Sequence, residues 1–316
     1  MHNPTSATDM SLDCIYIAAS ARDARFTRIC VASVRYFYPA VPIQLLVGGC
    51  LQRGLEEELR CYWDVGVADF PAGDYGWGFV KLEPLFRPPG ERFLVLDSDT
   101  VMTGPVLELA GHFDEDFIVD DENQSAEGAK TLYYDYERAV EEGNPMPVPA
   151  FLFNTGQWFG RSGVLTREDF GGLVRWGFPP RLVNPRVFKN GEQGVLNFVA
   201  NEQLRLGRIR VARVRLMRWP GHGMQGLDVH SVSKRLAAPL VVHWAGMKMA
   251  RQCDTVGADL LAFFERFYYR RLPDGEARRL FAGSRDVVSH WVLGARVRVK
   301  LASRKLTSMR GAAAPE

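Results

Sequence analysis

The sequence predicts an α/β fold in which a mostly parallel sheet is covered by helices, followed by a C-terminal helical extension. Three observations predict this fold. Short apolar runs rich in β-branched and aromatic residues alternate with segments of helical periodicity. A length of 316 residues suits one large domain, or one domain with a smaller appendage. The segment after the last apolar strand is helix-like and basic.

The first third of the chain alternates strand and helix patterns. Apolar runs predict strands at 14–20, 42–49, 67–70 and 93–97. Helical spacing predicts helices at 24–38, which Pro39 ends, and at 51–63, with a further helix at 77–86 interrupted near Pro84. This order is typical of a parallel sheet with helical crossovers.

The second part is less regular. An apolar segment flanked by acids lies at 115–121, and strands are predicted at 149–160, 208–214 and 239–246. Helices are predicted at 191–201, 256–272 and 287–306. We therefore expect a catalytic domain over residues 1–250 and a C-terminal helical extension over 251–316.

Composition excludes several classes of protein. A net charge of +2 gives no strong signal for nucleic-acid binding. No apolar run approaches the roughly 18 residues that a membrane span requires, and the polar opening segment does not resemble a signal peptide. The five cysteines show no CxxC spacing, so we expect reduced thiols that act as small buried hydrophobes. These features favour a cytoplasmic protein.

The most informative stretch is Asp97-Ser98-Asp99, which follows an apolar run. Alternate residues of a strand point to the same face, so the two carboxylates are expected to point the same way. Two anions this close repel by roughly 4 kcal/mol at 4 Å and an effective dielectric of 20 unless a cation lies between them. Carboxylate oxygens are hard ligands suited to Mg²⁺ or Mn²⁺.

Three interpretations of this pair compete: aspartates in a surface turn, a haloacid-dehalogenase-type phosphatase, and a nucleotide-sugar glycosyltransferase. The phosphatase family begins with its aspartate motif after the first strand, whereas here roughly three strands come first. That family also needs acids after a late strand, and the strand at 239–246 carries His243 without an adjacent acid. Both differences disfavour the phosphatase.

Besides the aspartate pair, with Lys81 sixteen residues before it, three further motifs are FNTG (153–156), GEQGVLN (191–197) and HWAGMK (243–248). Together these four separated motifs resemble family 8-type retaining glycosyltransferases of the GT-A fold, such as bacterial lipopolysaccharide galactosyl- and glucosyltransferases and glycogenin. HWAGMK has one residue fewer before Lys248 than the family pattern. The resemblance covers about residues 14–250 and implies a Rossmann-like catalytic domain.

The resemblance also implies roles for individual residues. Asp97, Asp99 and His243 would hold Mn²⁺ or Mg²⁺, and Lys81 and Lys248 would neutralise the departing diphosphate. Glu192 and Gln193 would contact the sugar near the reacting carbon, with Lys248 completing the catalytic set. Donor-binding positions are then Ala18, Ser20, Asp23, Lys81, Asp97, Ser98, Asp99, Asn154, Thr155, Gly156 and Gly246.

The nucleotide expected from the resemblance is UDP, although Ser20 and Arg22 stand where the lipopolysaccharide enzymes have aspartate and asparagine. Gly194 replaces the second aspartate of the family's helix motif, so recognition of the sugar hydroxyls should differ. An inverting enzyme that uses Asp120 or Asp121 as base is the alternative mechanism. A non-catalytic nucleotide-sugar-binding protein is the alternative of another class.

The acceptor implied by the resemblance is a glycan or a lipid-linked saccharide in bacterial surface polysaccharide synthesis. Aromatic residues at 133–140 and at Trp158, Trp176 and Trp219 are either acceptor-stacking or core residues. The basic tail after Ser284 is either a solvated segment or a peripheral contact with an anionic membrane.

Overall fold

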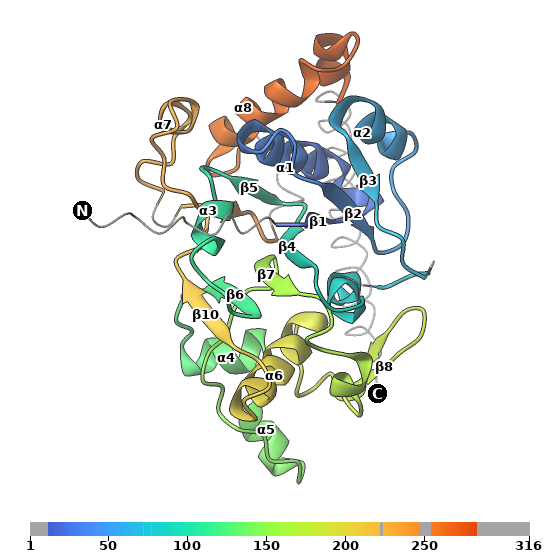
Figure 1. The fold of residues 1–316 in the computed structure, drawn as a ribbon, viewed down its shortest axis with the longest axis vertical. Coiled ribbons are helices and arrows are strands. Elements are labelled where there is room, and N and C mark those ends of the chain that lie inside the picture. The colour runs from blue at the N-terminus through green and yellow to red at the C-terminus, as the bar shows by residue number, and fades with distance from the viewer. Residues whose placement is uncertain (1–11, 72, 77, 222–223, 247–253, 283–316) are drawn as a thin grey trace, which may run out of the picture.

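A computed structural model describes residues 12–282, apart from 72, 77, 222–223 and 247–253. Its centre is a seven-stranded sheet in which β7 alone runs antiparallel to its neighbours. In spatial order the strands are β10 (Val211–Val214), β6 (Phe117–Asp120), β7 (Gln157–Arg161), β4 (Arg92–Asp97), β1 (Cys14–Ala19), β2 (Ile43–Val47) and β3 (Val65–Val67). The predicted α/β fold with a mostly parallel sheet is confirmed (Figure 1).

Two smaller sheets and several helices surround the central sheet. One small sheet has the order β11 (Met217–Arg218), β12 (Val241–His243), β5 (Thr100–Met102), and the other pairs β8 (Val174–Arg175) with β9 (Arg181–Leu182). The described helices are α1 (Ala24–Phe37), α2 (Leu55–Trp63), α3 (Leu107–Ala110), α4 (Ala126–Leu132), α5 (Tyr136–Glu141), α6 (Glu192–Arg205), α7 (Val229–Ser233) and α8 (Ala258–Tyr269), with 3-10 helices η1 (Ala21–Asp23), η2 (Phe79–Phe86) and η3 (Arg167–Phe170).

Both faces of the sheet are buried because hydrophobic side chains of β1 and β4 alternate between two cores. Ile15, Ile17 and Leu94 belong to the core that includes α1 and α8. Tyr16 and Val95 belong to the core that includes η2 and α6. A central strand covered on both sides reads as a continuous apolar run, which explains why β4 was recognisable in the sequence.

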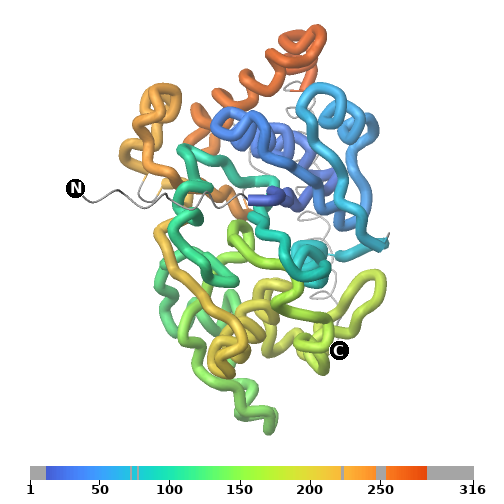
Figure 2. The backbone as a smooth tube through the Cα atoms, in the orientation of Figure 1, coloured from blue at the N-terminus to red at the C-terminus, as the bar shows by residue number. Residues whose placement is uncertain are grey.

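Helix α8 lies beside α1, although the two are far apart along the chain (Figure 2). Its buried residues Leu260, Phe264 and Tyr268 join the same core as α1. Arg25 of α1 also donates to Glu265 of α8 at 2.7 Å. The first helix of the predicted extension is therefore packed on the sheet domain, while the basic helix predicted at 287–306 lies outside the described residues.

Three predicted elements differ in the structure. The strand predicted at 67–70 is β3, which begins at Val65 after a left-handed turn at Asp64. The helix predicted at 77–86 is the 3-10 helix η2, with Pro84 inside it, where the proline ring would clash with the carbonyl four residues earlier in a regular α-helix. Of the strand predicted at 149–160, only the last four residues form a strand, as part of β7. The short strand β5, directly after the aspartate pair, was not predicted.

Cysteine placement differs from expectation at two positions. The four described cysteines are free, and Cys14 and Cys30 are buried as predicted, but Cys50 and Cys61 are exposed. Both exposed thiols lie in or next to the polar segment around α2, whose outward face is solvated. Within the described residues, no helix has the length and apolar character needed to cross a membrane.

Candidate active site

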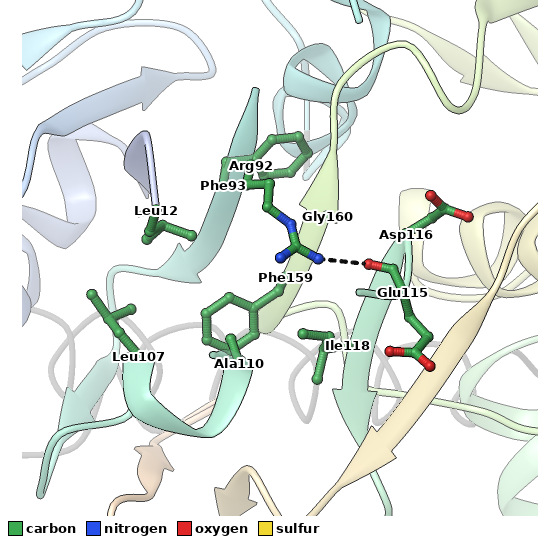
Figure 3. Close-up of a pocket in the computed structure, with 10 residues that line it drawn as sticks. All are labelled: Leu12, Arg92, Phe93, Leu107, Ala110, Glu115, Asp116, Ile118, Phe159 and Gly160. Atoms are coloured by element: carbon green, nitrogen blue, oxygen red, sulfur yellow. Dashed lines mark hydrogen bonds between the residues drawn. The ribbon is translucent and has the colours of Figure 1, made fainter. Parts of the chain in front are cut away.

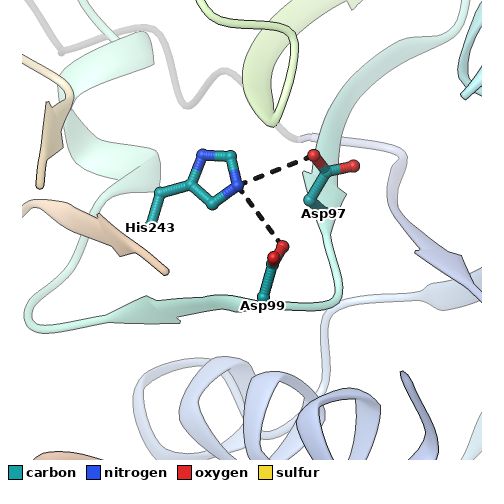
Figure 4. Close-up of side chains that lie close together, drawn as sticks. All are labelled: Asp97, Asp99 and His243. Carbon is teal, nitrogen blue, oxygen red and sulfur yellow. Dashed lines mark ion pairs between the residues drawn. The ribbon is translucent and has the colours of Figure 1, made fainter. Parts of the chain in front are cut away.

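Asp97, Asp99 and His243 converge beyond the carboxyl end of β4 (Figure 4). His243 Nε2 lies 3.3 Å from Asp99 Oδ1 and 3.7 Å from Asp97 Oδ2. Only 3% of the His243 and Asp99 side chains is exposed, against 23% for Asp97. The site therefore has two buried potential ligands and one that borders solvent.

The aspartates come together for a reason other than strand alternation. β4 ends at Asp97, where the backbone N–H still donates to Gly156 O at 2.7 Å, and Ser98 and Asp99 form a turn into β5. β5 pairs antiparallel with β12, which sets Thr100 opposite His243. The N–H of Trp244 also donates to Asp99 O at 2.9 Å. Strand pairing thus carries His243 across more than 140 residues of chain to the aspartate pair.

Lys81, on η2, lies beside the same carboxylates. Its Nζ is 3.1 Å from Asp97 Oδ1 and 2.6 Å from Glu192 Oε1, and it donates to Thr155 Oγ1 at 3.2 Å. Burial alone would lower the pKa of Lys81, but the charges of Asp97 and Glu192 outweigh it and hold that pKa above its usual range. Burial raises the pKa of Glu192, although the Lys81 ammonium opposes the shift. Lys81 is thus a cation fixed at the edge of the aspartate site.

A row of amides on α6 positions the segment that leads into β7. Gln193, Asn197 and Asn201 are four residues apart and so share one face of the helix. Asn201 accepts from Ala150 N at 2.7 Å, and Asn197 both accepts from Phe153 N at 2.9 Å and donates to Phe153 O at 3.0 Å. These side chains take the place of a neighbouring strand, which explains why residues before 157 are not part of the sheet.

The end of this segment lies at the site. Gln193 Oε1 accepts from Asn154 Nδ2 and from Thr155 N, both at 3.3 Å. Thr155 is only 1% exposed, and its hydroxyl donates to Glu192 Oε1 at 3.0 Å. Asn154 is half-buried. The structure therefore brings Asn154, Thr155, Glu192 and Gln193 together with Lys81.

Two glycines allow close approaches that a side chain would block. A Cβ on Gly156 would lie 2.2 Å from His243 Cε1, so the imidazole packs directly against this backbone. A Cβ on Gly194 would lie 2.3 Å from Tyr133 O and 2.7 Å from Lys189 O. The space next to Gly194 is thus filled by backbone of the 133 and 189 segments.

The remaining predicted donor positions lie at or after the ends of β1, β4 and β12. Ala18 pairs with Asp97 in register, and Ser20 Oγ donates to Asp23 Oδ2 at 2.7 Å. Ser98 is buried. Gly246 follows β12 with φ +74°, and Lys248 lies outside the described residues.

The side chain of Asp120 joins the end of β6 to the segment around β11 through hydrogen bonds to backbone N–H groups. It is 2% exposed, and its carboxylate accepts from Leu216 N at 2.8 Å, Met217 N at 2.7 Å and Glu122 N at 2.9 Å. Burial raises the pKa of Asp120, and these backbone N–H groups oppose the shift. Asp121, by contrast, is exposed.

Most of the aromatic acceptor candidates are core residues. Tyr133, Tyr134 and Trp158 are at most 2% exposed, and Trp158 stacks on Phe117. Trp176 packs edge-on against Phe86. Trp219 differs, because it stacks on His243 with ring centroids 5.4 Å apart.

Glu122 was missed by the sequence analysis. Its carboxylate accepts from the indole N–H of Trp219, with Nε1 3.0 Å from Oε1 and 3.2 Å from Oε2. A single glutamate after an acidic pair gave no signal for this contact, which joins residues 97 positions apart.

A small pocket lies at the other end of β4, where Arg92, Phe93 and Phe159 line it (Figure 3). Arg92 Nη2 donates to Glu115 O at 3.1 Å across it. Open α/β sheets bind ligands beyond the carboxyl ends of their strands, and this pocket lies at the amino end of β4. The aspartate–histidine cluster is therefore the candidate active site.

The donor set fits a hard divalent cation. Its three ligand atoms lie within 4.8 Å of one another. Ligands about 2.1 Å from a shared ion are separated by about 3.0 Å at right angles and about 4.2 Å when opposite. The distances from His243 Nε2 to Asp99 Oδ1, 3.3 Å, and to Asp97 Oδ2, 3.7 Å, fall between these limits. The two carboxylates are ligands that Mg²⁺, Ca²⁺ and Mn²⁺ prefer, and the imidazole adds a nitrogen donor.

The fold matches those of solved glycosyltransferases. The apo structure of the bifunctional glycosyltransferase WbbM aligns with a TM-score of 0.53 and 16% identity over 85% of this chain and 53% of the other. The galactosyltransferase LgtC, in complex with donor and acceptor sugar analogues, aligns with a TM-score of 0.52 and 16% identity over 84% and 99%. The apo form of the glycosyltransferase GlyE of Streptococcus pneumoniae TIGR4 aligns with a TM-score of 0.50 and 16% identity over 88% of this chain and 64% of GlyE.

This chain has the GT-A glycosyltransferase fold. It spans about half the length of WbbM and nearly all of LgtC. The sequence matches no protein-family model and no curated protein. At 16% identity the likeness establishes the architecture, so the activity has to be argued from the residues of the site.

Proposed function

We propose that the protein is a metal-dependent glycosyltransferase that moves a hexose from a nucleotide-sugar, with UDP as the nucleotide, to a glycan or lipid-linked acceptor. One observation carries the proposal: Asp97, Asp99 and His243 converge within 4.8 Å at the carboxyl end of β4 in a GT-A fold. Lys81 and Glu192 lie against the same cluster.

The chain's own residues supply position and charge. When bound at Asp97, Asp99 and His243, Mn²⁺ or Mg²⁺ would offset the negative charge of a diphosphate leaving group. Lys81 adds a fixed positive charge beside Asp97, where removal of one such contact typically lowers the rate about 10²–10³-fold. Lys248 is proposed as the second cation. Ala18, Ser20, Asp23, Ser98 and Gly246 are proposed to line the nucleotide.

Sugar recognition is assigned to the segment held by α6. Asn154 is half-buried and has its amide next to Gln193, so both can reach a sugar hydroxyl. Thr155 is buried and engaged with Lys81 and Glu192, and it therefore positions these two rather than meeting the sugar. Glu192 and Gln193 are proposed to contact the sugar near the reacting carbon, as the sequence resemblance implies.

Retention is the mechanism we favour, with a donor phosphate oxygen accepting the acceptor proton. The inverting alternative requires a carboxylate base. Asp120 is buried and already accepts three backbone N–H groups, which leaves Asp121 as the better placed of the two acids. The anomeric configuration of the product, determined by NMR, distinguishes the two mechanisms.

We place the reaction in bacterial surface polysaccharide or lipopolysaccharide synthesis at the cytoplasmic face of the membrane. The support is the acceptor class implied by the sequence resemblance and the seven basic residues after Ser284. A chain truncated at residue 284 should bind anionic vesicles more weakly than the full chain. Equal binding by both would remove the membrane contact from the proposal.

The test of the function is a screen of nucleotide-sugars with and without Mn²⁺, read by thermal stabilisation and by release of the nucleoside diphosphate. A donor at 100 times its Kd should stabilise the protein by about 2.7 kcal/mol. Asp99→Asn should abolish the Mn²⁺-dependent stabilisation and the Mn²⁺-dependent release of the nucleoside diphosphate. Asp114→Asn, at an exposed acid remote from the cluster, should keep both. Stabilisation without transfer or donor hydrolysis would indicate the non-catalytic binding protein.

A further inference from the structure

The imidazole of His243 presents one nitrogen to the aspartates and leaves the other buried. Nε2 faces Asp97 and Asp99, while Nδ1 has no hydrogen-bond partner among the residues that the structure describes. Metal-bound histidines almost always donate their second ring N–H to a carboxylate, a carbonyl or water, and this bond fixes the ring. A different interaction must orient His243.

The indole of Trp219 covers one face of that imidazole. The ring centroids are 5.4 Å apart and the planes are inclined by only 22°. A stacked ring resists rotation of the imidazole about its Cβ–Cγ bond, because turning would drive the ring edge into the indole. Trp219 therefore restricts the direction in which Nε2 points.

Glu122 in turn fixes the indole. Both of its carboxylate oxygens lie within 3.2 Å of Trp219 Nε1. The carboxylate of Asp120 also joins the two backbone segments that carry these side chains, because it accepts from Glu122 N and from Met217 N. Trp219 is thus held at its ring nitrogen and by the backbone two residues before it.

Backbone limits the imidazole on a further side. A Cβ on Gly156 would stand 2.2 Å from His243 Cε1 and 2.7 Å from Nδ1, so the ring and the Gly156 backbone are in direct contact. The N–H of Gly156 donates to Asn154 Oδ1 at 2.8 Å, which holds this backbone in place. The ring is confined by contacts at both Trp219 and Gly156.

We propose that Trp219 and Glu122 are positioning residues that orient His243 for the divalent cation by stacking, in place of the usual hydrogen bond to Nδ1. The inference rests on the proposed metal site and adds to it the residues that tune its affinity. Neither residue touches the reacting atoms in this assignment. Without the stacked indole the imidazole can rotate, so the ring has to be ordered when the cation binds, and this ordering lowers the affinity.

The experiment measures the Mn²⁺ Kd by calorimetry for the full chain and three variants, without donor. Loss of an outer partner of a metal-bound histidine typically weakens affinity by about 10–100-fold. Trp219→Leu should show a loss of at least about tenfold, and Trp219→Phe, which keeps a stacked ring but not the N–H, a smaller one. The Mn²⁺ Kd of Glu122→Ala should lie between that of the wild type and that of Trp219→Leu.

Two further readouts separate orientation from general damage. The unfolding midpoint of each variant, measured without metal, shows whether the fold is intact. The visible absorption spectrum of Co²⁺ bound in place of Mn²⁺ reports the ligand arrangement, and it should change in Trp219→Leu and stay near wild type in Trp219→Phe. The proposal is supported if Trp219→Leu and Trp219→Phe are both folded and Trp219→Leu shows the larger loss of Mn²⁺ affinity and the larger change in the Co²⁺ spectrum.

Two results would overturn the inference in distinguishable ways. If the wild type binds Mn²⁺ and Trp219→Leu binds it equally well with an unchanged Co²⁺ spectrum, stacking does not orient His243, while the proposed function stands. If the wild type itself does not bind Mn²⁺, the metal site of the proposed function fails, and the role of Trp219 fails with it.

Discussion

Lys81 Nζ lies 2.6 Å from Glu192 Oε1, and both side chains are buried, with 6% and 4% exposed. Their helices come from parts of the chain more than 100 residues apart. This ion pair joins η2 to the start of α6 and, through Asp97, to the carboxyl end of β4. It connects the three segments on which the proposed sugar and cation sites depend.

Replacing Lys81 by an uncharged residue should destabilise the protein, because the buried Glu192 carboxylate and the partly exposed Asp97 carboxylate would lose their cation. We expect Lys81→Met to lower the free energy of unfolding by about 3–5 kcal/mol. Lys81→Met/Glu192→Gln should recover part of that loss, because the buried Glu192 charge is gone as well. Urea denaturation of the two single variants and the double variant measures the coupling. Losses that simply add would show that Lys81 and Glu192 act independently.

Gly194 should not accept the aspartate that stands at this position of the motif in the family that the sequence resembles. The added Cβ would meet backbone oxygens of Tyr133 and Lys189, which have little freedom to move. Gly194→Ala should therefore destabilise the protein by about 1–3 kcal/mol, and Gly194→Asp by more. Gly177→Ala, where nothing lies within 4 Å of the new Cβ, is the matched control. A neutral Gly194→Ala in thermal unfolding would contradict the packing argument.

Glu83 should make stability depend on pH. Burial raises its pKa above the ordinary value of 4.5, and Arg167, whose Nη2 lies 2.6 Å away, only partly opposes this. The folded state then holds a proton that the unfolded state releases, so the contribution of Glu83 to stability is present below pH 4.5 and is lost as pH rises through the raised pKa.

Glu83→Gln removes this titration and should flatten the curve. The stability of the variant relative to wild type should therefore increase as pH rises above 4.5, by at most about 1.4 kcal/mol per pH unit. Urea denaturation at several pH values measures the difference. A constant offset between the two proteins across this range would mean that the pKa of Glu83 is the same in both states.

The four described cysteines should differ sharply in reactivity. Burial raises the pKa of both Cys14 and Cys30 to about 12, against an ordinary 9.0, which lowers the thiolate fraction roughly a thousandfold. Cys50 and Cys61 are exposed. Iodoacetamide at pH 8 should label the exposed pair in the folded protein and all four in urea, as mapped by mass spectrometry. Equal labelling of Cys30 in the folded state would contradict its burial.

Local sequence was sufficient for the strands and helices with strong periodicity. β1, α1, β4, α6 and α8 were predicted because each is long enough to show an apolar pattern of its own. The aspartate pair was also recognisable, because two carboxylates at the end of an apolar strand require a partner. Lys81 and the Glu192–Gln193 pair were predicted only through the resemblance of their motifs to family 8-type glycosyltransferases. Elements of two or three residues, such as β5 and β11, carry no such pattern.

Tertiary structure decided how these residues meet. Pairing of β5 with β12 brings His243 to the aspartates, and the amide row on α6 holds residues 150–155 outside the sheet. The contact between Glu122 and Trp219 likewise joins segments that are distant along the chain. Sequence by itself determined the chemical groups and the alternation of elements, because these follow from local polarity and periodicity. Their convergence depends on long-range strand pairing and packing, which no local pattern encodes.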